Sequence, residues 1–214
     1  MYRERLTITL ESNLLSAIDS MIDGQLLRNR SQTIEHLLKE GIGLHEIHRA
    51  FLFFTASLES KQLEAVTAFC LNNEINELLL GLPSGQTALL GDIQMQIRQQ
   101  ASNMSLVHVP TDFGTAGALI LQRASLNHPF LIINLNTSLH LPDNILPAYT
   151  FHRLLHAPLT RLIRPSANKQ YTPCGIEIVS PEMLLNIPAG IASLIDDVYP
   201  VMEKEGKVRT YVTD

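Results

Sequence analysis

The fold of this chain is decided by residues 51–83, which read FLFFTASLESKQLEAVTAFCLNNEINELLLGLP. Its two ends, FLFFTAS and ELLLGLP, are continuous apolar runs, as expected of strands that are buried on both faces of a sheet. The segment between them predicts a helix over 59–73, because its apolar side chains recur at helical spacing at Leu63, Val66, Phe69 and Cys70. This stretch therefore indicates an α/β layer rather than a helical bundle or a β-sandwich.

The same alternation continues toward the C-terminus. Further strands are predicted at 105–110, 130–136, 175–180 and 208–212. Helices are predicted at 86–101, 114–125, 181–187 and 191–204. Buried strands that alternate with helices are typical of a Rossmann-like three-layer α/β domain with a mostly parallel sheet. Residues 51–214 are assigned to one such domain.

Residues 1–44 have a different pattern. In residues 4–11, ERLTITLE, apolar and polar side chains alternate, which predicts a half-buried strand. Two amphipathic helices are predicted to follow, the first capped by Ser12 or Asn13 and the second by Ser31. One strand and two short helices enclose too little apolar surface to be stable alone. We therefore expect this unit to form a homodimer through the strand.

This order of elements resembles the ribbon-helix-helix family of repressors, the class of Arc and MetJ. The resemblance implies that residues 1–44 bind double-stranded DNA and that 45–50 form a linker. It places base contacts on the outward face of the strand, at Arg5, Thr7 and Thr9. It places phosphate contacts at Arg28, Arg30 and Ser31, around the start of the second helix, whose N–H groups attract anions, and at Arg3, just before the strand. The alternative is that the outward face is only the solvated side of an edge strand.

Composition limits the partners and the compartment. The net charge of −5 argues against non-specific coating of nucleic acid. Two cysteines, Cys70 and Cys174, imply no disulfide framework and fit a reducing cytosol. No apolar run reaches the length of about 20 residues that a membrane span needs, and the first residues do not resemble a signal peptide. We expect a cytoplasmic, nucleoid-associated protein with no membrane partner.

Three stretches of residues 51–214 resemble the sugar-phosphate nucleotidyltransferases, which make sugar nucleotides from nucleoside triphosphates. They are VPTDFGTAGALILQRA (109–124), PFLIINLNTSL (129–139) and CGIEIVSPEMLLNIP (174–188). The strongest match is GTAGAL, which in that family opens a helix near the nucleotide base. The resemblance implies a nucleotide or sugar-nucleotide ligand held near Gly114, Thr115 and Asn136.

The residues of this GTAGAL turn support two interpretations. Gly114 and Gly117 allow close approach of another group to the backbone, and Thr115 offers a hydroxyl at a helix start. These features fit a retained ligand pocket, but the same glycines also fit a helix that packs closely on the sheet. The histidine pairs His45/His48 and His152/His156 have no third ligand nearby, so no metal site is expected there.

Departures from that second family indicate a domain without catalysis. The family's glycine-rich phosphate loop is missing, because FLFFTAS runs directly into ESKQLEAV. Asn136 stands where the family has a metal-binding Asp, and a neutral amide is a poor ligand for Mg²⁺. The chain has no Trp, although the family's second metal-binding Asp lies in a Trp-containing segment. Since phosphoryl-type transfer depends on positioning and charge neutralisation, we expect no catalytic residues, no cofactor and no enzyme activity.

Together these observations predict a DNA-binding transcriptional regulator. Its C-terminal domain is expected to be a pseudoenzyme that senses a ligand or joins dimers into a higher oligomer. One alternative is an active sugar-phosphate nucleotidyltransferase with a DNA-binding tail, against which the missing phosphate loop argues. Another is an antitoxin-type repressor, although antitoxin tails are usually short and partly disordered, whereas this one is predicted to be folded.

Overall fold

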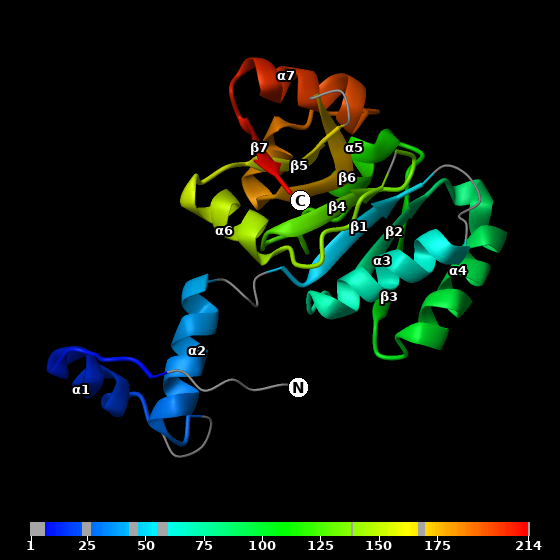
Figure 1. The fold of residues 1–214 in the computed structure, drawn as a ribbon. Helices are drawn as coiled ribbons and strands as arrows, with labels where there is room; N and C mark the ends of the chain where they lie inside the picture. The colour runs from blue at the N-terminus through cyan, green and yellow to red at the C-terminus, as the bar shows by residue number, and fades with distance from the viewer. Residues whose placement is uncertain are drawn as a thin grey trace. The chain divides into compact units, whose positions relative to one another are not determined.

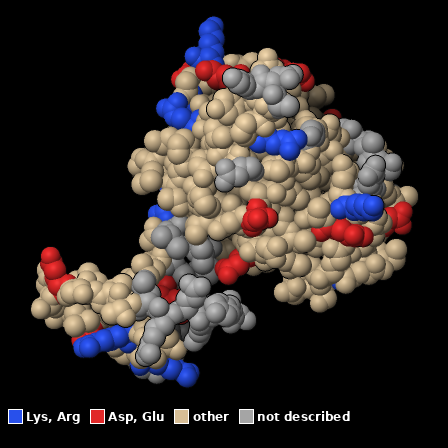
Figure 2. Space-filling view, in the orientation of Figure 1, with Lys and Arg blue, Asp and Glu red and all other residues tan. Residues whose placement is uncertain are grey.

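The computed structural model describes residues 7–22, 27–42, 47–54, 60–137, 139–166 and 170–213. The chain separates into two units, Met1–Leu44 and His45–Asp214. Among the described residues, no helix is both long and apolar enough to cross a membrane. On the face shown in Figure 2, basic and acidic side chains lie in small mixed groups among uncharged residues, so charge is not segregated there.

Within the described residues, the larger unit is built on a seven-stranded sheet with the order β3-β2-β1-β4-β6-β5-β7 (Figure 1). The strands are β1 (Arg49–Phe53), β2 (Glu77–Leu82), β3 (Ser105–Pro110), β4 (Phe130–Asn134), β5 (Leu159–Pro165), β6 (Tyr171–Val179) and β7 (Val208–Val212). β6 runs antiparallel to its neighbours β4 and β5, and the other pairs are parallel. The predicted α/β class with a mostly parallel sheet is confirmed.

Helices cover both faces of this sheet and give three layers. One face packs against α3 (Ser60–Asn72), α4 (Thr87–Gln100) and α6 (Leu146–Leu154) in a single apolar cluster. The other packs against α5 (Gly114–Leu121), the 3-10 helix η2 (Pro181–Asn186), the π-helix η3 (Leu194–Val198) and α7 (Tyr199–Lys204). A short 3-10 helix, η1 (Ser84–Gln86), precedes α4. Because β1 and β2 are buried from both sides, their sequences read as continuous apolar runs.

Two elements of this unit are not predicted by the sequence. α6 was not foreseen, although Pro147 lies in its first turn, where proline is well tolerated. β5 was not foreseen because Arg161 and Arg164 interrupt its apolar pattern. The helix predicted over 191–204 is in fact a π-helix followed by an α-helix, and α5 ends at Leu121 rather than at 125.

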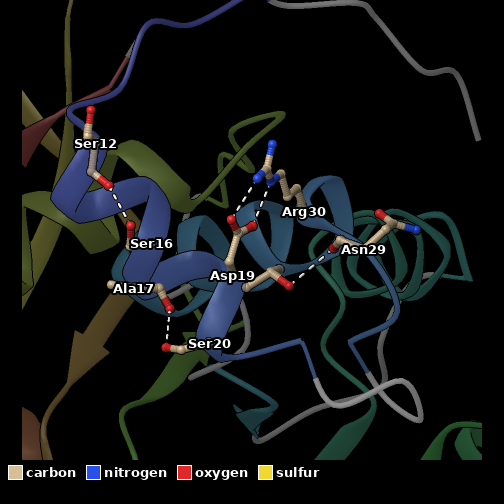
Figure 3. A network of polar contacts seen from close by, with 8 residues as sticks. Ser12, Ser16, Ala17, Asp19, Ser20, Asn29 and Arg30 are labelled. Carbon is tan, nitrogen blue, oxygen red and sulfur yellow. Dashed lines mark hydrogen bonds and ion pairs between the residues drawn. The ribbon is translucent and has the colours of Figure 1, made fainter.

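The smaller unit contains α1 (Ser12–Ser20) and α2 (Arg30–Ile42). Arg30 joins the two helices, because its Nε and Nη2 donate hydrogen bonds of 2.5 and 2.6 Å to the carboxylate of Asp19 (Figure 3). The cap of α2 differs from the prediction. The side chain of Asn29 accepts a hydrogen bond of 3.0 Å from the backbone N–H of Gln32, whereas Ser31 lies inside the helix.

The strand predicted over residues 4–11 is not found in its described part. Residues 7–11 form no strand in the structure, and residues 1–6 lie outside the described residues. A strand requires a neighbour that pairs with its backbone groups, and the described residues of this unit contain no other strand. Alternation of side chains alone therefore did not decide the local structure.

Candidate functional site

A cavity of about 550 Å³ lies where β1 and β4 end, on the α5 and α7 face of the sheet. The chain extends from β1 through β2 to β3 on one side and then returns to place β4 on the other. Such a reversal of strand order leaves a crevice outside the carboxyl ends of the strands, which is where open α/β sheets bind ligands. The topology thus accounts for the position of the cavity.

Four polar side chains form one wall of this cavity. Arg161 of β5 donates from Nε to Glu177 Oε1 at 3.1 Å and from Nη1 to Glu203 Oε1 at 2.6 Å. The hydroxyl of Tyr199 donates to the other oxygen of Glu177, Oε2. The guanidinium of Arg161 also lies 5.1 Å from the centre of the Tyr199 ring, a cation–π distance. We call these four residues the polar wall.

Burial sets the protonation behaviour of the polar wall. Removal from water raises the pKa of Glu177, and the Tyr199 hydroxyl and the Arg161 charge oppose that rise. Burial also raises the pKa of Tyr199 well above its usual value, and the neighbouring Glu177 carboxylate adds to the rise. Tyr199 therefore stays protonated and serves as a hydrogen-bond donor at neutral pH.

The floor of the cavity is the turn after β4. Asn134 Oδ1 accepts a hydrogen bond of 3.0 Å from the backbone N–H of Asn136, and the hydroxyl of Thr137 donates to the Asn134 carbonyl at 3.1 Å. Gly175 of β6 packs against this turn with a φ of +76°. A Cβ at Gly175 would lie 2.9 Å from Thr137 Oγ1, so only glycine allows β6 to approach the turn this closely.

A loop of the chain itself occupies the start of α5. The N–H of Ala116 donates to the Ala192 carbonyl at 3.0 Å, and the hydroxyl of Thr115 accepts from the N–H of Leu194 at 2.9 Å. Gly114 has a φ of +78°, and a Cβ there would lie 2.2 Å from the Ala192 oxygen. The absence of a Cβ at Gly114 therefore allows the backbone of the chain at Ala192 to pack against this turn.

The predicted ligand-binding residues are partly brought together. Thr115 and Asn136 both line the cavity, whereas Gly114 is packed against Ala192. The polar wall was missed by sequence reasoning. Its one available signal was charge inside apolar strands, at Arg161 in LTRLIRP and Glu177 in YTPCGIEIV. Such a charge is stable inside a fold only when it is paired.

The cavity does not offer the donor set that Mg²⁺ takes in proteins. Asn136 provides an amide, and the two carboxylates that line the cavity, Glu177 and Glu203, are bonded to Arg161. Among the described residues, no group of three or more His, Cys, Asp and Glu side chains is placed to hold a metal ion. The residues therefore do not fit the metal that the nucleotidyltransferase resemblance implies.

The predicted DNA-contacting residues lie in the smaller unit. Arg3 and Arg5 fall outside the described residues, as does His45 of the first histidine pair. Thr7 and Thr9 are exposed, but they are not part of a strand. Arg28, Arg30 and Ser31 are exposed near the start of α2, with Arg30 bonded to Asp19.

Comparison with known proteins identifies the fold of the larger unit. No family model and no curated protein sequence matches the chain. A solved structure from Bacillus anthracis, assigned as a glucose-1-phosphate thymidylyltransferase and bound to sucrose, is similar with a TM-score of 0.55 and 12% identity, over 78% of this chain and 87% of that chain. HddC from Yersinia pseudotuberculosis is similar with a TM-score of 0.56 and 12% identity, over 78% and 91%.

These similarities correct the functional prediction made from sequence. They show that the chain shares its fold with a protein assigned as a glucose-1-phosphate thymidylyltransferase, and neither they nor the described residues give support for DNA binding or for a ribbon-helix-helix unit. The prediction of a non-enzymatic DNA-binding regulator, with a repressor and pseudoenzyme character, is therefore wrong. The physical reason is that a strand-and-two-helix pattern covers only about 40 residues and is common, whereas the structural similarity covers 78% of the chain. The chain has a Rossmann-like nucleotidyltransferase fold.

Proposed function

We propose that residues 45–214 form an enzyme of the sugar-phosphate nucleotidyltransferase type. The observation that carries this proposal is the cavity of about 550 Å³ at the ends of β1 and β4, lined on one side by the polar wall. Its volume falls in the range of about 300–1,000 Å³ that is usual for small-molecule sites. Similar folds in a protein assigned as a glucose-1-phosphate thymidylyltransferase and in HddC support the same reading.

The lining suits the glycosyl part of a sugar phosphate. Phe53, Ile132 and Leu194 provide apolar surface for the faces of a sugar ring. The carboxylate, amide and hydroxyl groups of the polar wall and of the turn after β4 provide acceptors and donors for sugar hydroxyls. A small number of polar groups on an apolar lining is the usual composition of a ligand site.

In the proposed reaction, a phosphate oxygen of the sugar phosphate attacks the α-phosphorus of a nucleoside triphosphate. A new P–O bond forms, the bond from the α-phosphorus to the bridging oxygen breaks, and pyrophosphate leaves with that electron pair. The polar wall holds the glycosyl group in place while this occurs, and positioning of this kind lowers the barrier substantially. Because the cavity residues do not fit a metal ion, no step is assigned to one.

Pyrophosphate release tests this proposal. The full chain is incubated with each nucleoside triphosphate and glucose 1-phosphate, with and without Mg²⁺. Arg161→Gln should lower the rate at least about tenfold, because it removes the charge that holds the polar wall together. Arg98→Gln is the matched control, since Arg98 is an exposed residue of α4 on the other face of the sheet. No release with any pair, or an unchanged rate in Arg161→Gln, would overturn the proposal.

We also propose that the smaller unit pairs with a second copy of the chain. Of its described side chains, only Ile18 and Thr33 are buried, while apolar side chains are exposed at Ile8, Leu14, Met21, Leu37 and Leu38. A unit of this size cannot bury enough apolar surface by itself, and a second copy offers the same apolar faces. Basic and acidic residues are both present on its helices, so like-charge repulsion does not oppose pairing.

Sedimentation of the full chain tests whether the smaller unit pairs with a second copy. The unchanged protein should sediment as a dimer, and Leu38→Asp should give monomers, because it places a charge in the paired apolar face. His36→Asp adds the same charge at an exposed polar position of α2 and should remain dimeric. A monomeric unchanged protein, or a dimeric Leu38→Asp variant, would contradict the proposal.

A further inference from the structure

The charges that line the cavity are unequal. Among its described lining residues, the basic group is Arg161 alone, whereas the acidic groups are Glu177 and Glu203. Arg161 is bonded to both carboxylates, so its positive charge is already shared between them. The cavity therefore has more acidic than basic groups, and this is unusual for a site that takes a phosphate ester.

The two carboxylates differ in what they offer to a ligand. Glu177 is buried, and hydrogen bonds from Arg161 and Tyr199 engage both of its oxygens. Glu203 has a side chain that is 50% exposed, and the hydrogen bond from Arg161 goes to Oε1, which leaves Oε2 outside that bond. Glu203 is thus the carboxylate that a ligand in the cavity meets.

We propose that the cavity selects its glycosyl group by charge, with Glu203 as the specificity-determining residue. A sugar that carries a protonated amine is preferred over a neutral sugar, and a sugar that carries a carboxylate is rejected. An ammonium group gains attraction from Glu203, whereas a second carboxylate is repelled by Glu203 and finds Arg161 already paired. This inference rests on the proposed function, since it concerns the sugar of that reaction.

The burial of Arg161 and Glu177 also favours a sugar with an amine over a sugar with a carboxylate. Arg161 is only 20% exposed and Glu177 only 12%, so the shared charge between them is shielded from solvent and cannot rearrange freely toward a ligand. A ligand carboxylate would have to displace one of these partners and leave a buried charge unpaired. An amine needs no such displacement, because Glu203 Oε2 accepts directly.

Calorimetric titration at pH 7 tests the charge selection with three sugar phosphates that share the same phosphate. The full chain is titrated with glucosamine 1-phosphate, glucose 1-phosphate and glucuronic acid 1-phosphate. For a partly exposed charge pair, glucosamine 1-phosphate should bind about fivefold more tightly than glucose 1-phosphate, and glucuronic acid 1-phosphate should bind most weakly. In Glu203→Gln the advantage of the amine should fall to within about twofold, because the amide keeps its shape and loses its charge.

Glu205→Gln is the matched control. Glu205 lies two residues farther along, pairs with Lys207 and does not line the cavity, so this variant should keep the full order of the three ligands. Equal binding of the three sugars, tightest binding of the glucuronic acid ester, or an unchanged order in Glu203→Gln would overturn the inference and leave the proposed function standing. Absence of binding by all three would instead count against the proposed function itself.

Discussion

The imidazole Nε2 of His152 lies 2.8 Å from the hydroxyl oxygen of Ser180, and its Nδ1 lies 2.8 Å from that of Thr160. One histidine of α6 thus bridges β5 and the turn after β6. The hydroxyl of Ser180 also donates to the Ala157 carbonyl at 3.1 Å, so the bridge extends into the loop between α6 and β5. This interaction is a structural link rather than the metal ligand considered for His152/His156, since both ring nitrogens are engaged.

The buried His152 makes the fold sensitive to acid. Burial lowers the pKa of His152 to about 4 from 6.5, so the unfolded chain binds this proton more readily than the folded chain. The stability that the neutral, buried His152 contributes is fully present above the unfolded pKa of 6.5. It is lost as the pH falls from about 6.5 toward 4. We expect the free energy of unfolding to fall by about 2 kcal/mol between pH 7 and pH 5 from this group. Urea unfolding at both pH values, compared with the same pair for His152→Gln, isolates it. An equal pH dependence in the variant would contradict the assignment.

Gly114→Ala should destabilise the larger unit. The variant places a Cβ 2.2 Å from the Ala192 oxygen and forces a non-glycine residue to a φ of +78°. Backbone strain and displacement of the 190–194 loop together should cost about 2–4 kcal/mol. Gly91→Ala in α4 is the control, because a Cβ there meets nothing within 4 Å and a helical alanine is favourable. Equal stability of the two variants in urea would show that the close approach is unimportant.

Thr115→Val should weaken the link between α5 and η3, two elements that line the cavity. It replaces the hydroxyl that accepts from the Leu194 N–H with a methyl group, at a cost of about 1–3 kcal/mol for the unpaired N–H. Amide hydrogen exchange at Leu194 should therefore become faster in this variant. Thr115→Ser keeps the acceptor and should restore slow exchange. If valine and serine behave alike, the hydroxyl does not hold η3.

Tyr199→Phe tests the polar wall as a stabilising unit. The variant leaves Glu177 Oε2 without its donor in a buried position, and loss of a hydrogen bond to a charged group costs about 1.5–3 kcal/mol. Tyr171→Phe removes a hydroxyl from an exposed position of β6 and should be neutral. Chemical unfolding of both proteins gives the comparison. A Tyr199→Phe variant as stable as the control would show that the hydrogen bond from Tyr199 to Glu177 does not stabilise the fold.

The sequence predicts the sheet well where burial is complete on both faces. Residues such as Phe51, Leu79 and Ile132 lie in apolar runs that need no partner to be recognised. The polar wall was beyond sequence reasoning for a physical reason. Arg161 meets Glu177 and Glu203 across 16 and 42 positions of the chain, and no local pattern encodes such a contact.

The smaller unit shows the opposite limit. The alternation of Thr7, Ile8 and Thr9 is a clear strand pattern, yet these residues are not in a strand. Alternation indicates which side chains would share a face if the segment were a strand. It does not provide the neighbouring strand whose backbone groups the segment must pair with. Thr115 and Asn136, in contrast, were chosen from a motif and do line the cavity, because a motif reflects the whole fold around it.

The hydrogen bond between Thr115 and the Leu194 N–H spans 79 positions of the chain, and the cavity takes residues from Phe53 to Glu203. A ribosome must therefore have released almost all of this domain before the site exists. Until then, the incomplete domain exposes the apolar side chains of β1 and β4 on the face that η2, η3 and α7 later cover. Contacts of such long sequence separation form slowly, so newly made chains should depend on chaperones more than their modest size suggests.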